Sequence, residues 1–155
     1  MASLTLRPAD SSEWDEVMTL AFSVFLDFEA DSYGPKGTEA FKDFLSDEML
    51  RKLFIAGHYK VMVAELDGVI VGMASVRNGN HLSLLFVDKE YHRLGVGRRL
   101  LEYIKNYLMD YTEHPDMTVN SSPYAVDFYH KIGFVDTGDV AEEDGIIYTP
   151  MRWTF

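Results

Sequence analysis

Hydrophobic and polar residues follow two periods along this chain, one typical of strands and the other of helices. Three runs rich in apolar and β-branched residues stand close together, at 60–66, 69–77 and 81–87. The dipeptides between these runs, Asp67-Gly68 and Asn78-Gly79, are typical of tight hairpin turns. The pattern therefore predicts an antiparallel meander, and its apolar surface on both sides predicts that helices cover each face.

Two helices are predicted before the meander. The first spans 14–25, where apolar residues recur at helical spacing, and Ser12 with Asp15 fits a capping box at its start. The segment 31–37, DSYGPKG, breaks the helical pattern. Thr38 is a candidate cap for the second helix. The inner face expected for that helix consists of Phe41, Phe44, Leu45 and Met49.

The second half of the chain predicts a crossover between parallel strands. An amphipathic helix is expected at 96–111, and Pro123 and Gly133 bound a shorter one. The remaining strands are expected at 4–8, 117–120, 133–139 and 145–155. The resulting order is β-α-α-β-β-β-α-β-α-β-β, which is an α/β fold with a mixed, mostly antiparallel sheet. We expect one domain over residues 1–155.

Composition narrows the classes of partner and of chemistry. The chain has 14 Lys and Arg residues against 25 Asp and Glu residues, giving a formal net charge of −11. Such a protein is expected to bind neither nucleic acid nor membrane, but to attract cationic amines. It has no cysteine, and its five histidines lack zinc-binding spacing, so no metal is expected. No export signal is recognised at the N-terminus, so a cytoplasmic protein is expected.

The junction YHRLGVGRRLL, between the meander and the helix at 96–111, has features of an anion-binding turn. Helix N-termini present unpaired backbone N–H groups and a partial positive charge. Gly95 and Gly97 carry no Cβ, so a phosphate can approach successive amides, and Arg98 and Arg99 add positive charge. A plain strand-to-helix turn with solvent-exposed arginines is the alternative, and the pattern alone does not decide between them.

Two separated motifs resemble those of the GCN5-related N-acetyltransferases. YHRLGVGRRLL after LLFVD resembles the acetyl-coenzyme A motif of that family, Q/R-x-x-G-x-G/A. SSPYAVDFYHKIGF resembles the following motif, a helix that carries a tyrosine and ends in Gly-Phe. The opening LRPAD and the order of elements also match, so the resemblance covers essentially the whole chain. His92 departs from the usual Gln or Arg, and Ser122 replaces an asparagine found in many members.

The resemblance implies an acetyl-coenzyme A-dependent N-acetyltransferase and assigns roles to residues. The main chain at Phe86 and Val87 would pair with the pantetheine arm, and Tyr129 would contact the cofactor and protonate the departing thiolate. Further cofactor contacts are expected at His92, Arg93, Leu94, Gly95, Val96, Gly97, Arg98, Arg99, Asn120 and Ser122. Because the chain lacks cysteine, direct attack by a primary amine in a ternary complex is favoured over a covalent acetyl-cysteine.

The sequence does not identify the base that deprotonates the amine. His81 titrates in a suitable range, and Glu65 is an isolated charge in an apolar strand, so both are candidates. Glu29 or a water molecule is a further option. By resemblance, the segment around Glu29 closes over a small-molecule or peptide amine, and substrate contacts are expected at Phe25, Phe28, Glu29 and Tyr33.

Two other classes of function are compatible with the same residues. A non-catalytic acyl-CoA-binding or sensing module would keep the glycine-containing turn without transferring the acetyl group. A structural interaction domain would bind no cofactor. The apolar terminal strand at 145–155 suits pairing with a second copy of the chain, and burial in the core explains it equally well, so a homodimer stays open.

Overall fold

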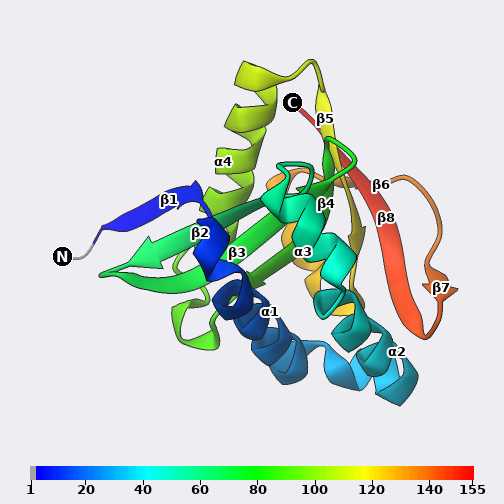
Figure 1. The fold of residues 1–155 in the computed structure, drawn as a ribbon. Helices are drawn as coiled ribbons and strands as arrows, with labels where there is room; N and C mark the ends of the chain where they lie inside the picture. The colour runs from blue at the N-terminus through cyan, green and yellow to red at the C-terminus, as the bar shows by residue number, and fades with distance from the viewer. Residues whose placement is uncertain (1–2) are drawn as a thin grey trace.

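The computed structural model describes residues 3–155 and contains a mixed sheet of eight strands (Figure 1). The strand order is β1-β2-β3-β4-β5-β8-β6, and β7 pairs with β8. All neighbouring strands are antiparallel except β4 and β5, which are parallel. The strands are β1 (Leu4–Pro8), β2 (Lys60–Leu66), β3 (Val69–Arg77), β4 (His81–Val87), β5 (Asp116–Ser121), β6 (Val135–Asp136), β7 (Ala141–Glu143) and β8 (Ile146–Thr154).

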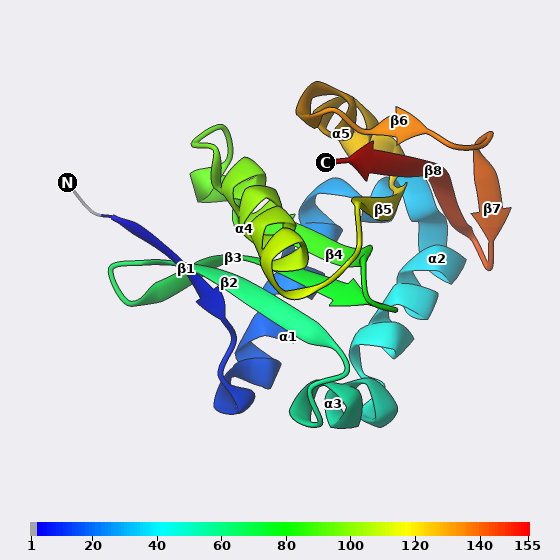
Figure 2. The ribbon, with the colours of Figure 1, turned by 90° about the horizontal axis from the view of Figure 1, so that it is seen from above.

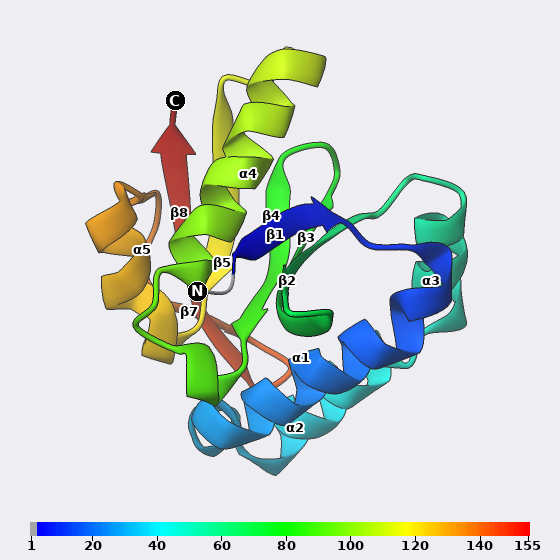
Figure 3. The same cartoon turned by 90° about the vertical axis from the view of Figure 1, so that its left-hand side faces the viewer.

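Helices cover both faces of the sheet, as Figures 2 and 3 show. The α-helices are α1 (Trp14–Phe28), α2 (Ala30–Leu45), α3 (Glu48–Ile55), α4 (Val96–Tyr111) and α5 (Val126–Ile132), with short 3-10 helices at η1 (Ser11–Glu13), η2 (Lys89–Tyr91) and η3 (Pro123–Ala125). One apolar core, which includes Phe25 and Met73, lies on the side of α1, α2 and α3. The other, which includes Ile104 and Met117, lies on the side of α4 and α5. None of the helices in residues 3–155 has the length and apolar character needed to cross a membrane.

The region 29–55 differs from the sequence prediction. α2 begins at Ala30, and its backbone is non-helical at Gly34 (φ 72°, ψ −179°), so two helical stretches meet at a kink inside the predicted break at 31–37. Thr38 lies within the second stretch, so the prediction that Thr38 caps the helix is wrong. Asp47 then starts a separate helix, α3, by accepting a hydrogen bond from the backbone N–H of Met49 at 2.8 Å. Because α3 has its own orientation, the Met49 side chain is 60% exposed, and its predicted place on an inner face is also wrong.

The other strands and helices follow the predicted order, with differences near the C-terminus. The meander strands at 60–66, 69–77 and 81–87 have the predicted bounds. The segment 133–139 contributes only the two residues of β6, whereas β7 was not predicted. β7 and β8 form a hairpin, which extends beyond the main layer of the sheet in Figure 1.

A buried hydroxyl network fixes the place where β4 departs from regular pairing. The register of β3 and β4 shifts at Ser75 and Val76, so Ser83 of β4 has no paired residue on β3. The Tyr59 hydroxyl lies 2.6 Å from Ser75 Oγ and donates to Ser83 Oγ at 3.1 Å. Because a buried hydroxyl without a partner is unfavourable, these contacts stabilise the irregularity in β4.

We therefore expect Tyr59→Phe to lower the free energy of unfolding by about 1–3 kcal/mol, because it leaves two serine hydroxyls without their partner. Chemical denaturation measures this change. Tyr111→Phe is the matched control, because Tyr111 is 78% exposed and its hydroxyl faces solvent. Equal stability of the two variants would show that the network contributes nothing.

Candidate active site

A narrow cavity lies where β4 and β5 part. The two strands pair only at His81–Thr118 and Leu82–Val119. Beyond these residues the cavity, of about 80 Å³, is enclosed by α1, α2, α5 and the two strands. A wider cavity of about 500 Å³ adjoins it on the side of α2 and the β7–β8 hairpin. The two cavities share six lining residues, Tyr33, Phe41, Leu82, Ser83, Leu84 and Asn120.

Glu29 brings a carboxylate into the narrow cavity from the junction of α1 and α2. Its backbone N–H donates to the Phe25 carbonyl at 2.8 Å, so the last turn of α1 fixes its position. Burial raises the pKa of the Glu29 carboxyl, and a hydrogen bond with Ser122 offsets this rise only in part. A carboxylate in such surroundings is a stronger base than an exposed one.

Tyr129, on α5, lines the same cavity and is only 5% exposed. Its ring packs edge-on against Phe128 and Phe134, with centroids 5.3 and 5.1 Å apart. Burial raises the pKa of the Tyr129 phenol well above its usual value, and the charges of Glu29 and Tyr33 raise it further. Tyr129 is therefore protonated at neutral pH and can donate a hydrogen bond.

Tyr33 is the third titratable group of the cavity and lines both the narrow and the wide part. Burial raises the pKa of its phenol, and the nearby Glu29 carboxylate raises it further. The ring of Tyr33 packs edge-on against Phe25, with centroids 5.0 Å apart. The sequence-predicted residues Phe25, Glu29, Tyr33 and Tyr129 are thus brought together around one cavity.

The turn before α4 has the amides that an anion requires. The backbone N–H groups of 93–95 make no hydrogen bond to another backbone group in the described part of the chain, and those of 96–98 form the unpaired first turn of α4. Gly95 is left-handed (φ 79°), and nothing lies within 4 Å of the place where its Cβ would be. This turn fits a phosphate group, with Arg98 and Arg99 exposed beside it.

Gly97 also has a packing role that the sequence did not suggest. A Cβ at this position would lie 3.2 Å from the ring of Phe128, so the missing side chain allows α4 and α5 to pack closely. The prediction that Gly97 contributes to a phosphate-binding turn stays a prediction, and the packing against Phe128 is a further reason for a glycine here. Its backbone N–H still belongs to the unpaired first turn of α4.

His92 connects this turn to β4 and to α1. Its Nε2–H donates to the Val87 carbonyl at 2.6 Å, so that carbonyl already has a partner. The imidazole stacks on Phe28 with centroids 4.7 Å apart, and Phe28 also stacks on Tyr124 at 5.2 Å. Phe28, predicted to contact the substrate, therefore lies against the turn and the start of η3 instead of lining either cavity.

His81 lines the wide cavity at the first residue of β4. Its Nδ1 lies 2.8 Å from Thr118 Oγ1, across the short parallel pairing. Burial and the positive charge of Arg77 lower the pKa of His81 to about 4. The imidazole is therefore neutral at physiological pH but is a weak base.

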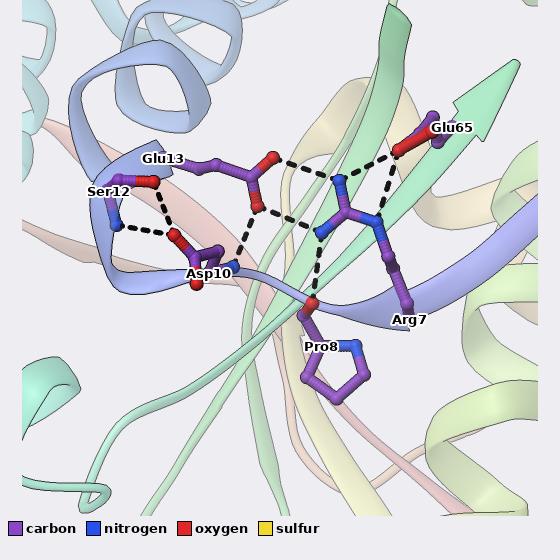
Figure 4. Close-up of polar contacts among 6 residues, drawn as sticks. All are labelled: Arg7, Pro8, Asp10, Ser12, Glu13 and Glu65. Carbon is purple, nitrogen blue, oxygen red and sulfur yellow. Dashed lines mark hydrogen bonds and ion pairs between the residues drawn. The ribbon is translucent and has the colours of Figure 1, made fainter. Parts of the chain in front are cut away.

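Glu65 lies away from both cavities, in a cluster that joins β1, η1 and β2 (Figure 4). Arg7 donates to Glu65 at 2.8 Å and to both carboxylate oxygens of Glu13 at 2.9 Å. Glu13 in turn accepts from the backbone N–H of Asp10, so Asp10 and Glu13, not Ser12 and Asp15, form the capping box. Glu65 is thus paired with Arg7 and lines neither cavity, which does not favour the predicted catalytic role.

The structure adds residues that the sequence analysis did not select. Ser83 lines both cavities, and Arg77 lines the wide one. Only the position of Arg77 before Asn78-Gly79, at the end of a strand leading to the site, could have drawn attention to it. Within residues 3–155, no group of three or more His, Asp or Glu side chains is arranged to hold a metal ion.

Comparisons with known proteins agree with this architecture. A sequence model of the acetyltransferase (GNAT) domain matches residues 29–155. The peptidyl-lysine N-acetyltransferase YjaB of Escherichia coli is 29% identical over 119 residues, which cover 70% of this chain and 76% of YjaB. A GCN5-related N-acetyltransferase from Rhodopseudomonas palustris superposes with a TM-score of 0.85 at 24% identity, over 100% of this chain and 98% of that one. PaiA N-acetyltransferase from Thermoplasma acidophilum, in complex with coenzyme A, gives 0.80 at 18% identity and 99% coverage of both chains.

We expect Glu65→Gln to lower the free energy of unfolding by about 1 kcal/mol or less, because the lost ion pair is partly exposed. Amine-dependent release of coenzyme A should stay within about twofold of the unsubstituted protein. Glu102→Gln, at an exposed position of α4, is the control for the change of charge. A large loss of turnover at unchanged Tm would restore Glu65 as a catalytic candidate.

Proposed function

The chain belongs to the GNAT acetyltransferase family, and we propose that it moves the acetyl group of acetyl-coenzyme A directly to a primary amine in a ternary complex. The observation that carries this proposal is the pair of Glu29 and Tyr129 in one narrow cavity. One group can accept a proton and the other can donate one. Such a pair, with pKa values raised by burial, is typical of a site for acid–base catalysis.

The residues around the cavity suit the parts of acetyl-coenzyme A, which supplies the thioester carbonyl. The unpaired amides of 93–98 would hold its diphosphate, with Arg98 and Arg99 at the rim. The uncovered edge of β4 beyond Leu82 would pair with the pantetheine arm. Val87 is the less suitable position on this edge, because its carbonyl already accepts from His92.

The reaction needs one bond formed and one broken. The amine nitrogen bonds to the carbonyl carbon, and the C–S bond breaks to release the coenzyme A thiolate. In our proposal Glu29 takes the proton that the amine loses, and Tyr129 donates to the thiolate. The phenol of Tyr129 then recovers a proton from Glu29, so that the net transfer is from the amine to the thiol.

Glu29 is a better base than His81 for this step. The raised pKa of its carboxyl brings it nearer to neutral pH, whereas the pKa of His81 is lowered to about 4. Glu29 also lines the narrow cavity with Tyr129, and His81 lines only the wide one. Loss of activity on acidification should therefore follow Glu29.

We expect Tyr129→Phe to lower kcat by about 100-fold or more with little change in affinity for coenzyme A, because the ring stays packed while the proton donor is lost. Release of coenzyme A thiol with a panel of alkylamines, polyamines and lysine peptides measures turnover, and calorimetry measures affinity. Tyr124→Phe, with an exposed ring, is the control. An unmodified protein that binds acetyl-coenzyme A and releases no thiol with any amine would instead be a non-catalytic binding module.

A second variant tests the base. Glu29→Gln should lower kcat by about 100-fold and remove the acidic limb of the pH–rate profile, which lies above the ordinary carboxyl pKa because burial raises that of Glu29. The same burial makes the ionised carboxylate unfavourable in the folded protein, so the contribution of Glu29 to stability is complete below the ordinary carboxyl pKa and is lost as the pH rises through its raised folded pKa. Glu29→Gln should therefore keep or raise Tm at pH 7.

His81→Ala is the companion variant. An acidic limb unchanged by His81→Ala and abolished by Glu29→Gln supports Glu29. A limb near pH 4 that disappears with His81→Ala would assign the base to His81.

A further inference from the structure

The wide cavity carries charges of both signs that do not pair with each other. Its positive group is Arg77, at the end of β3. Its negative groups are Glu143 and Asp144, from the β7–β8 hairpin. Among residues 3–155, none of these three side chains forms an ion pair. Opposite charges that face one cavity without neutralising each other remain available to a ligand.

Arg77 is held at the sheet side of the cavity. It pairs with His81 across β3 and β4, and its charge contributes to the lowered pKa of that histidine. The backbone of Arg77 is therefore beside the start of β4, and its side chain lines the wide cavity. A planar guanidinium without a protein partner is well suited to bind a carboxylate.

The carboxylates of Glu143 and Asp144 lie on the β7–β8 hairpin, which packs directly against α2. Glu143 and Ile146 are paired, so Asp144 and Gly145 form the tight turn of the hairpin. A Cβ at Gly37 of α2 would lie 2.8 Å from the carbonyl oxygen of Gly145, so helix and turn are in direct contact. Glu143 and Asp144 thus stand at a defined edge of the cavity, where they favour a cation.

This inference rests on the acetyl transfer proposed above and names its acceptor. We propose that the acceptor is an α,ω-diamino acid with free α-groups, such as free lysine. Its α-carboxylate pairs with Arg77, and its α-ammonium faces Glu143 and Asp144. Its slender side chain passes between the aromatic and aliphatic residues of both cavities and presents the terminal amine to Glu29.

The dimensions of the site agree with this assignment. From His81, which is paired with Arg77, to Ser83, which lines both cavities, is two residues of β4, or about 7 Å at the rise of a strand. An extended four-methylene chain spans a similar length. Three of the six residues that line both cavities, Phe41, Leu82 and Leu84, are apolar and suit methylene groups.

Other amines match the cavity less well. A polyamine carries no anion for Arg77, so it can use only the carboxylates of the hairpin and leaves the guanidinium group unpaired. The α-groups of a lysine inside a peptide are amides, which leave the charges on both walls unpaired. Only an acceptor with both α-charges satisfies Arg77 and the hairpin together.

Four amine substrates test the contributions of the α-carboxylate and the α-ammonium separately. Lysine has both, 6-aminohexanoate lacks the α-ammonium, cadaverine lacks the α-carboxylate, and pentylamine lacks both. The expected order of kcat/KM places lysine first and pentylamine last. Arg77→Gln should lower kcat/KM by about 10- to 100-fold for lysine and 6-aminohexanoate, because a charge-assisted hydrogen bond is lost, and leave cadaverine and pentylamine within about twofold.

A double variant that removes both hairpin charges tests their contribution to binding of the α-ammonium. Glu143→Gln with Asp144→Asn should lower kcat/KM by about 3- to 10-fold for lysine and cadaverine, since these carboxylates are exposed, and spare 6-aminohexanoate. Arg51→Gln is the control for loss of a cation, because Arg51 lines a separate groove between α1 and α3. Arg77→Lys should restore part of the preference for a carboxylate. Unchanged Tm and coenzyme A affinity establish that the variants are folded.

The outcomes distinguish this inference from the proposed function. Equal acetylation of lysine and pentylamine, or equal effects of Arg77→Gln on all four amines, overturns the inference while acetyl transfer stands. Acetylation of polyamines or peptide lysines with none of the four probes accepted overturns it as well. Failure to release thiol with every amine of the wider panel overturns the proposed function itself.

Discussion

β4 and β5 hydrogen-bond in parallel at His81–Thr118 and Leu82–Val119 and nowhere further along their length. Each strand is held by a different neighbour, β4 by β3 and β5 by β8, so the two follow different directions once their own pairing ends. The Tyr59 hydroxyl network supports the irregular part of β4 at this point. The separation leaves a strand edge uncovered inside the molecule, and side chains from α1, α2 and α5 reach the space that results.

Glu29 and Tyr129 influence each other through that space. The charge on Glu29 raises the pKa of the Tyr129 phenol, so an ionised Glu29 makes Tyr129 a weak acid. Once Glu29 has accepted a proton this repulsion disappears, and Tyr129 becomes a stronger acid as the thiolate leaves. The two proton transfers are thus coupled electrostatically in the proposed reaction, and the low polarity around them strengthens the coupling.

Much of the fold could be predicted from the sequence because its signals are local. Hairpin dipeptides set the bounds of the meander, and helical periodicity identified α4. Effects that depend on tertiary packing could not be predicted. The separate helix α3 follows from the cap at Asp47, the role of Gly97 follows from contact with Phe128, and Glu65 is explained by Arg7, which is 58 residues away in sequence. Arg77 had only a weak sequence signal, its position before Asn78-Gly79, because the sequence does not show that its side chain lines a cavity.

The contact between Gly37 and Gly145 joins a helix of one layer to a turn formed by the last strands of the chain. The kink at Gly34 and Pro35 lies within one turn of this contact. A substitution that adds a side chain at Gly37 or Gly145 would therefore disturb the outer wall of the wide cavity, whereas the backbone N–H of Glu29 is held by the Phe25 carbonyl of α1 and Tyr129 belongs to α5. The hairpin carboxylates and the Tyr129 phenol thus depend on different packing contacts, even though the two cavities share part of their lining.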